Sequence, residues 1–334
     1  MLPRRKYGRL GVTSAVAGAA LVVMLIVGWL LEGRGNTDAQ EAIAELARTA
    51  DGDPATAIAN ASRANRVVIL SDIHESVATK RLAVNAIQKI AATAGLDAVA
   101  LEVGSDLQPV IDRYLDSNPE DASILVTNER ALREPGPASR GYLDIYRTIW
   151  KLNQELGADR RIQIVAADLH GWPTARPGAP AELARKSAER DAHMLKQIRD
   201  VMALNPGARV LVFMTGYHAL KGTTGELQTG GAEPVQIAWL GGRLHQSMPE
   251  EVYSILVDAP VVGRATDITA YAGTAIGDIV KRNGGNRSFV TPVTSQLDAI
   301  RRPLITRKSP GLSFELLPRD YKLSDVADAY IFLR

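Results

Sequence analysis

The sequence contains no cysteine among its 334 residues. Disulfide bonds, thiolate zinc sites, iron–sulfur clusters and a cysteine nucleophile are therefore excluded. Aromatic residues make up only 5%, and 39 Lys and Arg residues are nearly balanced by 37 Asp and Glu residues. A nucleic-acid-binding protein normally shows a clustered basic surface with rings that stack on bases. The composition therefore argues against nucleic acid as a partner.

The signatures of three familiar enzyme classes are also missing. The stretch HESVATKR, which begins at His74, has Ala78 where the HExxH zinc-protease motif requires its second histidine. No GxSxG sequence occurs, so the nucleophilic serine of an α/β-hydrolase is not expected. The stretches GGAEP and GGR lack the strand–loop–helix context of a nucleotide-binding loop.

The one long apolar run lies near the N-terminus. Leu10–Leu31 is an uncharged stretch of 22 residues, longer than the roughly 20 residues that span a bilayer as a helix. It exceeds the apolar core of a cleaved signal peptide and ends in a poor cleavage site, so we predict an uncleaved signal anchor. Four basic residues lie within residues 1–9. They predict a cytoplasmic tail and a main domain on the periplasmic side of the cytoplasmic membrane.

Residues 32–62 are rich in small and polar residues and predict a linker, which leaves residues 63–334 for the globular domain. Short apolar runs predict strands at Arg66–Leu70, Asp97–Val103, Arg161–Leu169, Val210–Met214, Val235–Leu240, Val252–Val257 and Ala329–Leu333. Helical periodicity predicts helices at Val77–Ala94, Leu107–Leu115, Tyr142–Leu156 and Ala181–Met202. This alternation predicts an α/β fold with a largely parallel β-sheet flanked by helices. Residues 117–140 are expected to be irregular, and residues 260–310 show no clear period.

Polar side chains follow the predicted strands, where ligands bind in sheets of this kind. Three of the five histidines, His74, His170 and His218, come just after such strands. Glu102 lies inside the apolar run VALEV, and an unpaired buried charge is costly. Its partner is expected to be His74 or His218, with a structural ion pair to an arginine as the alternative.

Two chemistries use a histidine–carboxylate–histidine set without a protein nucleophile. In one, a histidine base oriented by a carboxylate activates water. In the other, His74, Glu102 and His218 hold a divalent metal that lowers the pKa of a bound water. Both are hydrolytic, and both require a small-molecule or peptide substrate.

Six segments, in this order, resemble proteins of the erythromycin esterase-like group, within a wider superfamily that includes ChaN-type haem-binding proteins and Tiki/TraB proteins. They are VVILSDIHESVATKRLAVNAI, GLDAVALEVGSDLQPVIDRYL, YLDIYRTIWKLNQELGADRRIQIVAADL, ERDAHMLKQI, VLVFMTGYHAL and DVADAYIFL. Together they extend over most of residues 67–333. The resemblance implies the same α/β fold and a hydrolytic or ligand-binding site.

The resemblance also implies roles for five residues. His74 would be the general base on water or a metal ligand, and Glu102 would orient it. His218 and Arg190 would stabilise a developing oxyanion or position the substrate. Asp168 would brace the site.

The sequence departs from the resemblance at two positions. Ser71 stands three residues before His74, where the group usually has glycine, and Thr215 replaces a glycine found in some branches. The leading hypothesis is a membrane-anchored hydrolase of esters or amides. The rival is a ChaN-type protein that binds haem or a metal without turnover, with Tyr217 and the histidines as iron ligands. A third possibility is a degenerate member that acts only in an envelope assembly.

Overall fold

The computed structural model describes residues 41, 44–45, 52–74, 76–132, 137–172, 180–222, 224–229, 235–259, 287–293, 306–309, 312–315 and 322–334. No helix within these ranges has the length and apolarity needed to cross a membrane. The predicted signal anchor, residues 10–31, and most of residues 260–310 lie outside the described residues.

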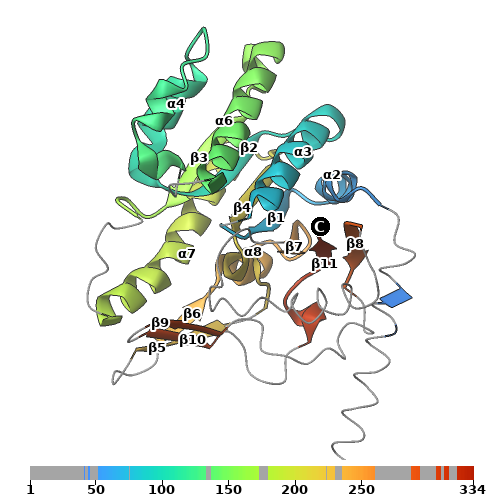
Figure 1. The fold of residues 1–334 in the computed structure, drawn as a ribbon, viewed down its shortest axis with the longest axis vertical. Helices are drawn as coiled ribbons and strands as arrows, with labels where there is room; N and C mark the ends of the chain where they lie inside the picture. The colour runs from blue at the N-terminus through green and yellow to red at the C-terminus, as the bar shows by residue number, and fades with distance from the viewer. Residues whose placement is uncertain are drawn as a thin grey trace, which may run out of the picture.

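Seven strands form the main sheet in the order β3-β2-β4-β1-β7-β11-β8 (Figure 1). Their bounds are β1 (Val67–Asp72), β2 (Ala98–Gly104), β3 (Gln163–Asp168), β4 (Val210–Thr215), β7 (Val252–Asp258), β8 (Phe289–Pro292) and β11 (Ala329–Phe332). Neighbouring strands run parallel, except that β8 is antiparallel to β11. The predicted α/β class with a largely parallel sheet is therefore confirmed.

The central strands are mostly apolar because helices cover both faces of the sheet, and the polar residues of β1 and β4 come at their carboxyl ends. Along β1, Val67 and Ile69 belong to one core, while Val68 and Leu70 belong to the other. Every residue of β1 and β4 is buried. This explains why the strands appear in the sequence as continuous apolar runs and not as alternating ones.

One face of the sheet carries α2 (Pro54–Ala64), α3 (Val77–Thr93), α4 (Gln108–Leu115) and α6 (Pro137–Glu155). The opposite face carries α7 (Pro180–Leu204) and α8 (Leu240–Ser247). Short helical segments are η1 (Ser105–Leu107), α5 (Ser123–Val126), η2 (Glu129–Leu132), η3 (Ala158–Arg160), η4 (Gly216–Ala219) and η6 (Leu323–Asp325). The region expected to be irregular, residues 117–140, thus contains α5, η2 and the start of α6.

Helix α2 lies in sequence that we had assigned to the linker. Asp53 caps it by accepting hydrogen bonds from the backbone of Ala55 and Thr56, and Pro54 at the first position favours a helix start. Ile58 is fully buried in the core that α3 also lines. The folded domain therefore begins before residue 63, because the apolar face of α2 packs onto it.

A second, antiparallel sheet contains β6 (Val235–Ala238), β5 (Thr224–Thr229), β10 (Leu312–Glu315) and β9 (Thr306–Ser309) in that order. The strand predicted at Val235–Leu240 belongs to this sheet, and its last two residues instead lead into α8. Figure 1 shows this sheet apart from the main one, near the start of α7.

Candidate functional site

Four adjacent strands, β3, β2, β4 and β1, bring their carboxyl ends to the same edge of the sheet. The residues gathered there form what we call the His74 cluster: Asp72, His74, Lys80, Glu102, Asp168, Arg190, Asp191, Thr215 and His218. All five residues that the sequence singled out as catalytic belong to it. His170, the third histidine that follows a strand, is exposed and is not one of them.

Glu102 is at the centre of the cluster. The pairing of β2 with β3 shifts register between Leu101 and Gly104, and such an irregularity re-aims the side chain that it carries. The carboxylate is fully buried. Its Oε1 accepts a hydrogen bond from Arg190 at 2.5 Å, and its Oε2 accepts from the backbone N–H of Thr215 at 2.9 Å.

Arg190 links two carboxylates. From α7 it donates through Nε and one terminal nitrogen to both oxygens of Asp168, at 2.9 and 2.7 Å. Its guanidinium also lies 4.6 Å from the centre of the Trp172 ring. The arginine alternative considered for Glu102 is thus realised, since the guanidinium is a closer partner than either histidine.

His74 lies in the turn that follows β1, and both of its ring nitrogens have partners. Nδ1 is 2.9 Å from Asp72 Oδ2, and Nε2 is 2.5 Å from Thr215 Oγ1. Nε2 is also 3.7 Å from Glu102 Oε2. The His74 side chain is 15% exposed, whereas Glu102 is completely buried. His74 is therefore the member of this pair that a substrate can approach.

Asp72 is held ionised although it is completely buried. Burial alone would raise its pKa, but the Lys80 ammonium, 2.8 Å away, and the contact with His74 hold the pKa well below its usual range. Lys80 is itself fully buried and donates to the backbone oxygens of Ile73 and His74 at 2.8 and 2.6 Å. Lys80 therefore fixes both the acid beside His74 and the turn that carries the histidine.

The burial of Lys80 depends on a glycine in α6. A Cβ added to Gly141 would lie 2.5 Å from the Lys80 Cβ, which is too close for two carbon atoms. Only glycine lets the lysine stem pass at this point. Lys80 is a site residue that the sequence analysis missed, because a lysine in an amphipathic helix normally lies on its exposed face.

His218 is a buried cation. Burial would lower its pKa, but the charges of Asp191 and Glu102 raise it to about 10. Its Nδ1 is 2.7 Å from Asp191 Oδ1, which also accepts from the backbone N–H of Leu240 at the start of α8. Its Nε2 lies 3.5 Å from Glu102 Oε1 and has no hydrogen-bond partner. His218 thus holds a proton donor at the centre of the cluster.

The residues expected to bind a metal or haem show a different arrangement. Within the described ranges, no group of three or more His, Asp or Glu side chains is placed to hold a metal ion. The oxygens of Glu102 face Arg190 and Thr215 instead, so the set as arranged does not fit a metal. The Tyr217 ring packs against the rings of His218 and Trp239, with centroid distances of 4.4 and 4.9 Å.

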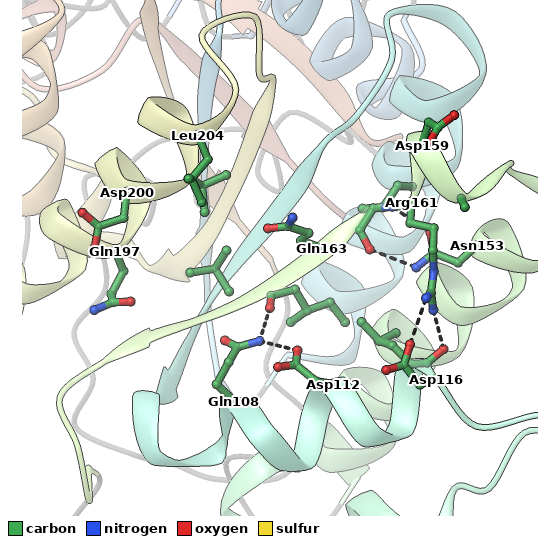
Figure 2. Close-up of a pocket in the computed structure, with 16 residues that line it drawn as sticks. Gln108, Asp112, Asp116, Asn153, Asp159, Arg161, Gln163, Gln197, Asp200 and Leu204 are labelled. Carbon is green, nitrogen blue, oxygen red and sulfur yellow. Dashed lines mark hydrogen bonds and ion pairs between the residues drawn. The ribbon is translucent and has the colours of Figure 1, made fainter.

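A separate polar groove of about 650 Å³ runs along β3, an edge strand of the main sheet, between α4 and α7 (Figure 2). Its lining includes Gln108, Asp112, Asn153, Arg161, Gln163 and Asp200, and we call it the edge groove. None of its lining residues belongs to the His74 cluster.

Comparison with known proteins shows similarity in fold alone. No protein-family model matches the sequence, and no curated protein matches it. A succinoglycan biosynthesis protein aligns with 88% of this chain and 97% of its own, at 10% identity and a TM-score of 0.61. A mutant of erythromycin esterase EreC, in its open conformation, aligns with 82% of this chain and 91% of its own, at 12% identity and a TM-score of 0.54.

A structure of ChaN of Campylobacter jejuni aligns with 61% of this chain and 85% of its own, at 13% identity and a TM-score of 0.39. The succinoglycan biosynthesis protein and the esterase establish the class of fold. The chain therefore shares its fold with these two proteins, and the fold that the sequence resemblance implied is confirmed.

Proposed function

We propose that this protein is a hydrolase of esters or amides in which His74 is the general base. The observation that supports this most strongly is the environment of His74. Its partly exposed ring is fixed on the Nδ1 side by an ionised, buried aspartate, and its Nε2 faces the rest of the cluster. A carboxylate in this position selects the ring tautomer and stabilises the imidazolium that forms during proton transfer.

Of the two buried cations, His218 and Arg190, the first is placed to stabilise the negative charge that forms during hydrolysis. When a carbonyl carbon is attacked, its oxygen becomes negative, and fixed donors in a buried site stabilise that charge. His218 Nε2 is such a donor and has no hydrogen-bond partner. Arg190 donates to Glu102 and Asp168 through Nε and one terminal nitrogen, so its role is to hold those carboxylates in place.

We also propose that the domain acts outside the cytoplasm, anchored by residues 10–31. The support is the sequence: an uncharged run of bilayer length preceded by basic residues. A hydrolase held at the membrane would meet substrates of the periplasm or envelope. Labelling of an engineered cysteine in the α2 region with a membrane-impermeant reagent on intact cells tests this orientation.

The activity is tested with the full-length protein in detergent, using a panel of aryl esters, alkyl esters, lactones and peptides. We expect wild-type protein to hydrolyse at least one class and His74→Ala to lose that activity. His245→Ala is the matched control, because His245 contacts Ser254 and lies outside the cluster. Silence of the wild type across the whole panel, with and without divalent metals, would contradict the proposal.

A further inference from the structure

Both ring nitrogens of His74 are occupied by protein atoms. Asp72 is ionised and can only accept a hydrogen bond, so Nδ1 must carry a proton. In the neutral ring Nε2 is then the acceptor, and the atom nearest to it with a hydrogen bond to offer is Thr215 Oγ1, 2.5 Å away. Nε2 is thus placed to take the Thr215 hydroxyl proton, which in the structure is donated to Glu102 Oε2 at 2.6 Å.

Thr215, His74 and Asp72 are arranged as a nucleophile, a base and an acid that orients the base. An activated hydroxyl nucleophile is recognised by a hydrogen bond to a base that a third group orients. Here Oγ1, Nε2, Nδ1 and the Asp72 carboxylate form one continuous chain of contacts, with steps of 2.5 and 2.9 Å outside the ring. We propose that Thr215 is the covalent nucleophile of the hydrolysis, an inference that rests on the proposed function.

Glu102 fixes the nucleophile from the other side. Its Oε2 is the acceptor of both the Thr215 backbone N–H, at 2.9 Å, and the Thr215 hydroxyl, at 2.6 Å. Thr215 has one hydroxyl proton, which it directs either to Glu102 or to His74. Once the proton passes to His74, the imidazolium lies between two carboxylates, Asp72 at 2.9 Å and Glu102 at 3.7 Å.

The reaction balances with water as the only co-substrate. Thr215 Oγ1 forms a bond to the substrate carbonyl carbon as its proton moves to His74 Nε2, and the carbonyl oxygen becomes an oxyanion. The oxyanion then collapses, the bond to the leaving alcohol or amine breaks, and the leaving group takes the proton from His74. Water attacks the resulting Thr215 ester and gives a proton to His74. The bond between the acyl carbon and Thr215 Oγ1 then breaks, the acid is released, and His74 returns the proton to Oγ1.

An oxyanion donor lies in the same cluster. His218 Nε2 is buried, carries a proton, has no hydrogen-bond partner and contacts the same Glu102 carboxylate as Thr215 does. The contact of this nitrogen with Glu102 Oε1, at 3.5 Å, is longer than a normal hydrogen bond, so a closer acceptor would stabilise the buried donor. A tetrahedral oxyanion on Thr215 would provide that acceptor.

The inference is tested with full-length protein, an aryl acetate ester and a fluorophosphonate probe that traps activated hydroxyl groups. Acid-quenched wild-type protein should carry an acetyl group, and probe-treated protein a phosphonyl group, both mapped to Thr215 by peptide mass spectrometry. Thr215→Val should lower kcat by at least about 10³-fold, the scale expected when a nucleophile is removed. Thr215→Ser should retain both activity and labelling, which excludes a collapse of the fold as the cause.

Thr148→Val is the matched control, because Thr148 is a buried threonine in α6 whose hydroxyl donates to the backbone oxygen of Asp144. It should leave turnover and labelling unchanged. If the wild type and Thr215→Val turn over the ester equally, or if no adduct forms at Thr215 during turnover, the nucleophile assignment is wrong while the hydrolase proposal stands. If the wild type neither turns over an ester nor takes the probe, both fail.

Discussion

The His74 cluster and the edge groove are both polar, but their polar groups have different partners. In the cluster, charged side chains pair with one another away from water, as Arg190 does with Glu102 and Asp168. In the edge groove, neutral amides pair with the backbone. Gln108 donates to Ile164 O at 2.7 Å and accepts from Ala166 N at 2.8 Å, on the open side of β3.

Asn153 pairs with the chain just before β3 in the same way. Its amide donates to Ile162 O at 2.9 Å and accepts from Ile162 N at 2.7 Å. An open edge strand exposes unpaired backbone groups that invite association with another chain. The two amides therefore protect the edge, whereas the cluster holds charges that are suited to chemistry. The size of a groove does not distinguish these roles, but the identity of each polar partner does.

The largest expected effect separates the two regions by activity. Glu102→Gln removes the charge beside Thr215 and His74, so kcat/KM should fall about 10²–10⁴-fold, the range typical of proton-transfer groups. Asp112→Asn in the edge groove changes an exposed carboxylate that accepts a hydrogen bond from Gln108, and should leave kcat/KM within about twofold. Steady-state kinetics on one ester measure both. An equal loss of kcat/KM in the two variants would show that the His74 cluster and the edge groove do not differ in their role in catalysis.

The second effect is on stability and compares two arginines. Arg190→Met leaves two buried carboxylates without their cation, which should cost about 3–5 kcal/mol. Arg161→Met in the edge groove removes an ion pair with Asp116 at 2.8 Å whose side chains are 39% and 66% exposed. This loss should cost at most about 1 kcal/mol. Urea denaturation gives both values, and similar costs would show that burial does not separate the pairs.

The third effect tests edge protection. Asn153→Leu leaves the N–H and C=O of Ile162 without their partners, and burying such groups should cost about 1–3 kcal/mol. Ester turnover should be unchanged, because the cluster is intact.

A second experiment tests association directly. Light scattering of the double variant that carries Gln108→Ala and Asn153→Ala should show concentration-dependent association. A monodisperse double variant would argue against edge protection.

The last effect is a pH slope, about 1.4 kcal/mol for each pH unit. The folded protein keeps the His218 proton up to a pKa of about 10, whereas an unfolded chain releases it near 6.5. The stability from this group is therefore complete below pH 6.5 and is lost as the pH rises toward 10. Between pH 7.5 and 9 the wild type should lose about 1.4 kcal/mol per pH unit more than His218→Gln. Parallel pH dependence in the two proteins would show that His218 is not a cation in the fold.

Much of the fold was predictable because its periodicity is local. The strand runs beginning at Arg66 and Val210 and the helix ending near Gly95 all match the structure closely. Gly95 has φ +80°, a conformation that glycine adopts readily at the end of a helix. The linker boundary was wrong because a short helix such as α2 is decided by its packing against α3 and not by its own composition.

The candidate site was only partly predictable. Strand ends identified His74, Glu102, Asp168 and His218, and the resemblance added Arg190. Lys80 was missed, since its burial depends on Gly141, which lies 61 positions away in the sequence. Thr215 was recognised as a polar residue after the fourth strand and as a departure from glycine, but it received no role, because nothing local indicates that its hydroxyl meets His74.

By itself, the sequence determined that strands alternate with helices and that charged side chains follow the strands. Both features depend on neighbouring residues and on the cost of burying charge in an apolar run. Only the tertiary structure decided which charge pairs with which, and that His74 meets a hydroxyl 141 residues away. The reason is that the order of strands in the sheet sets these contacts, and that order arises from packing across the whole domain.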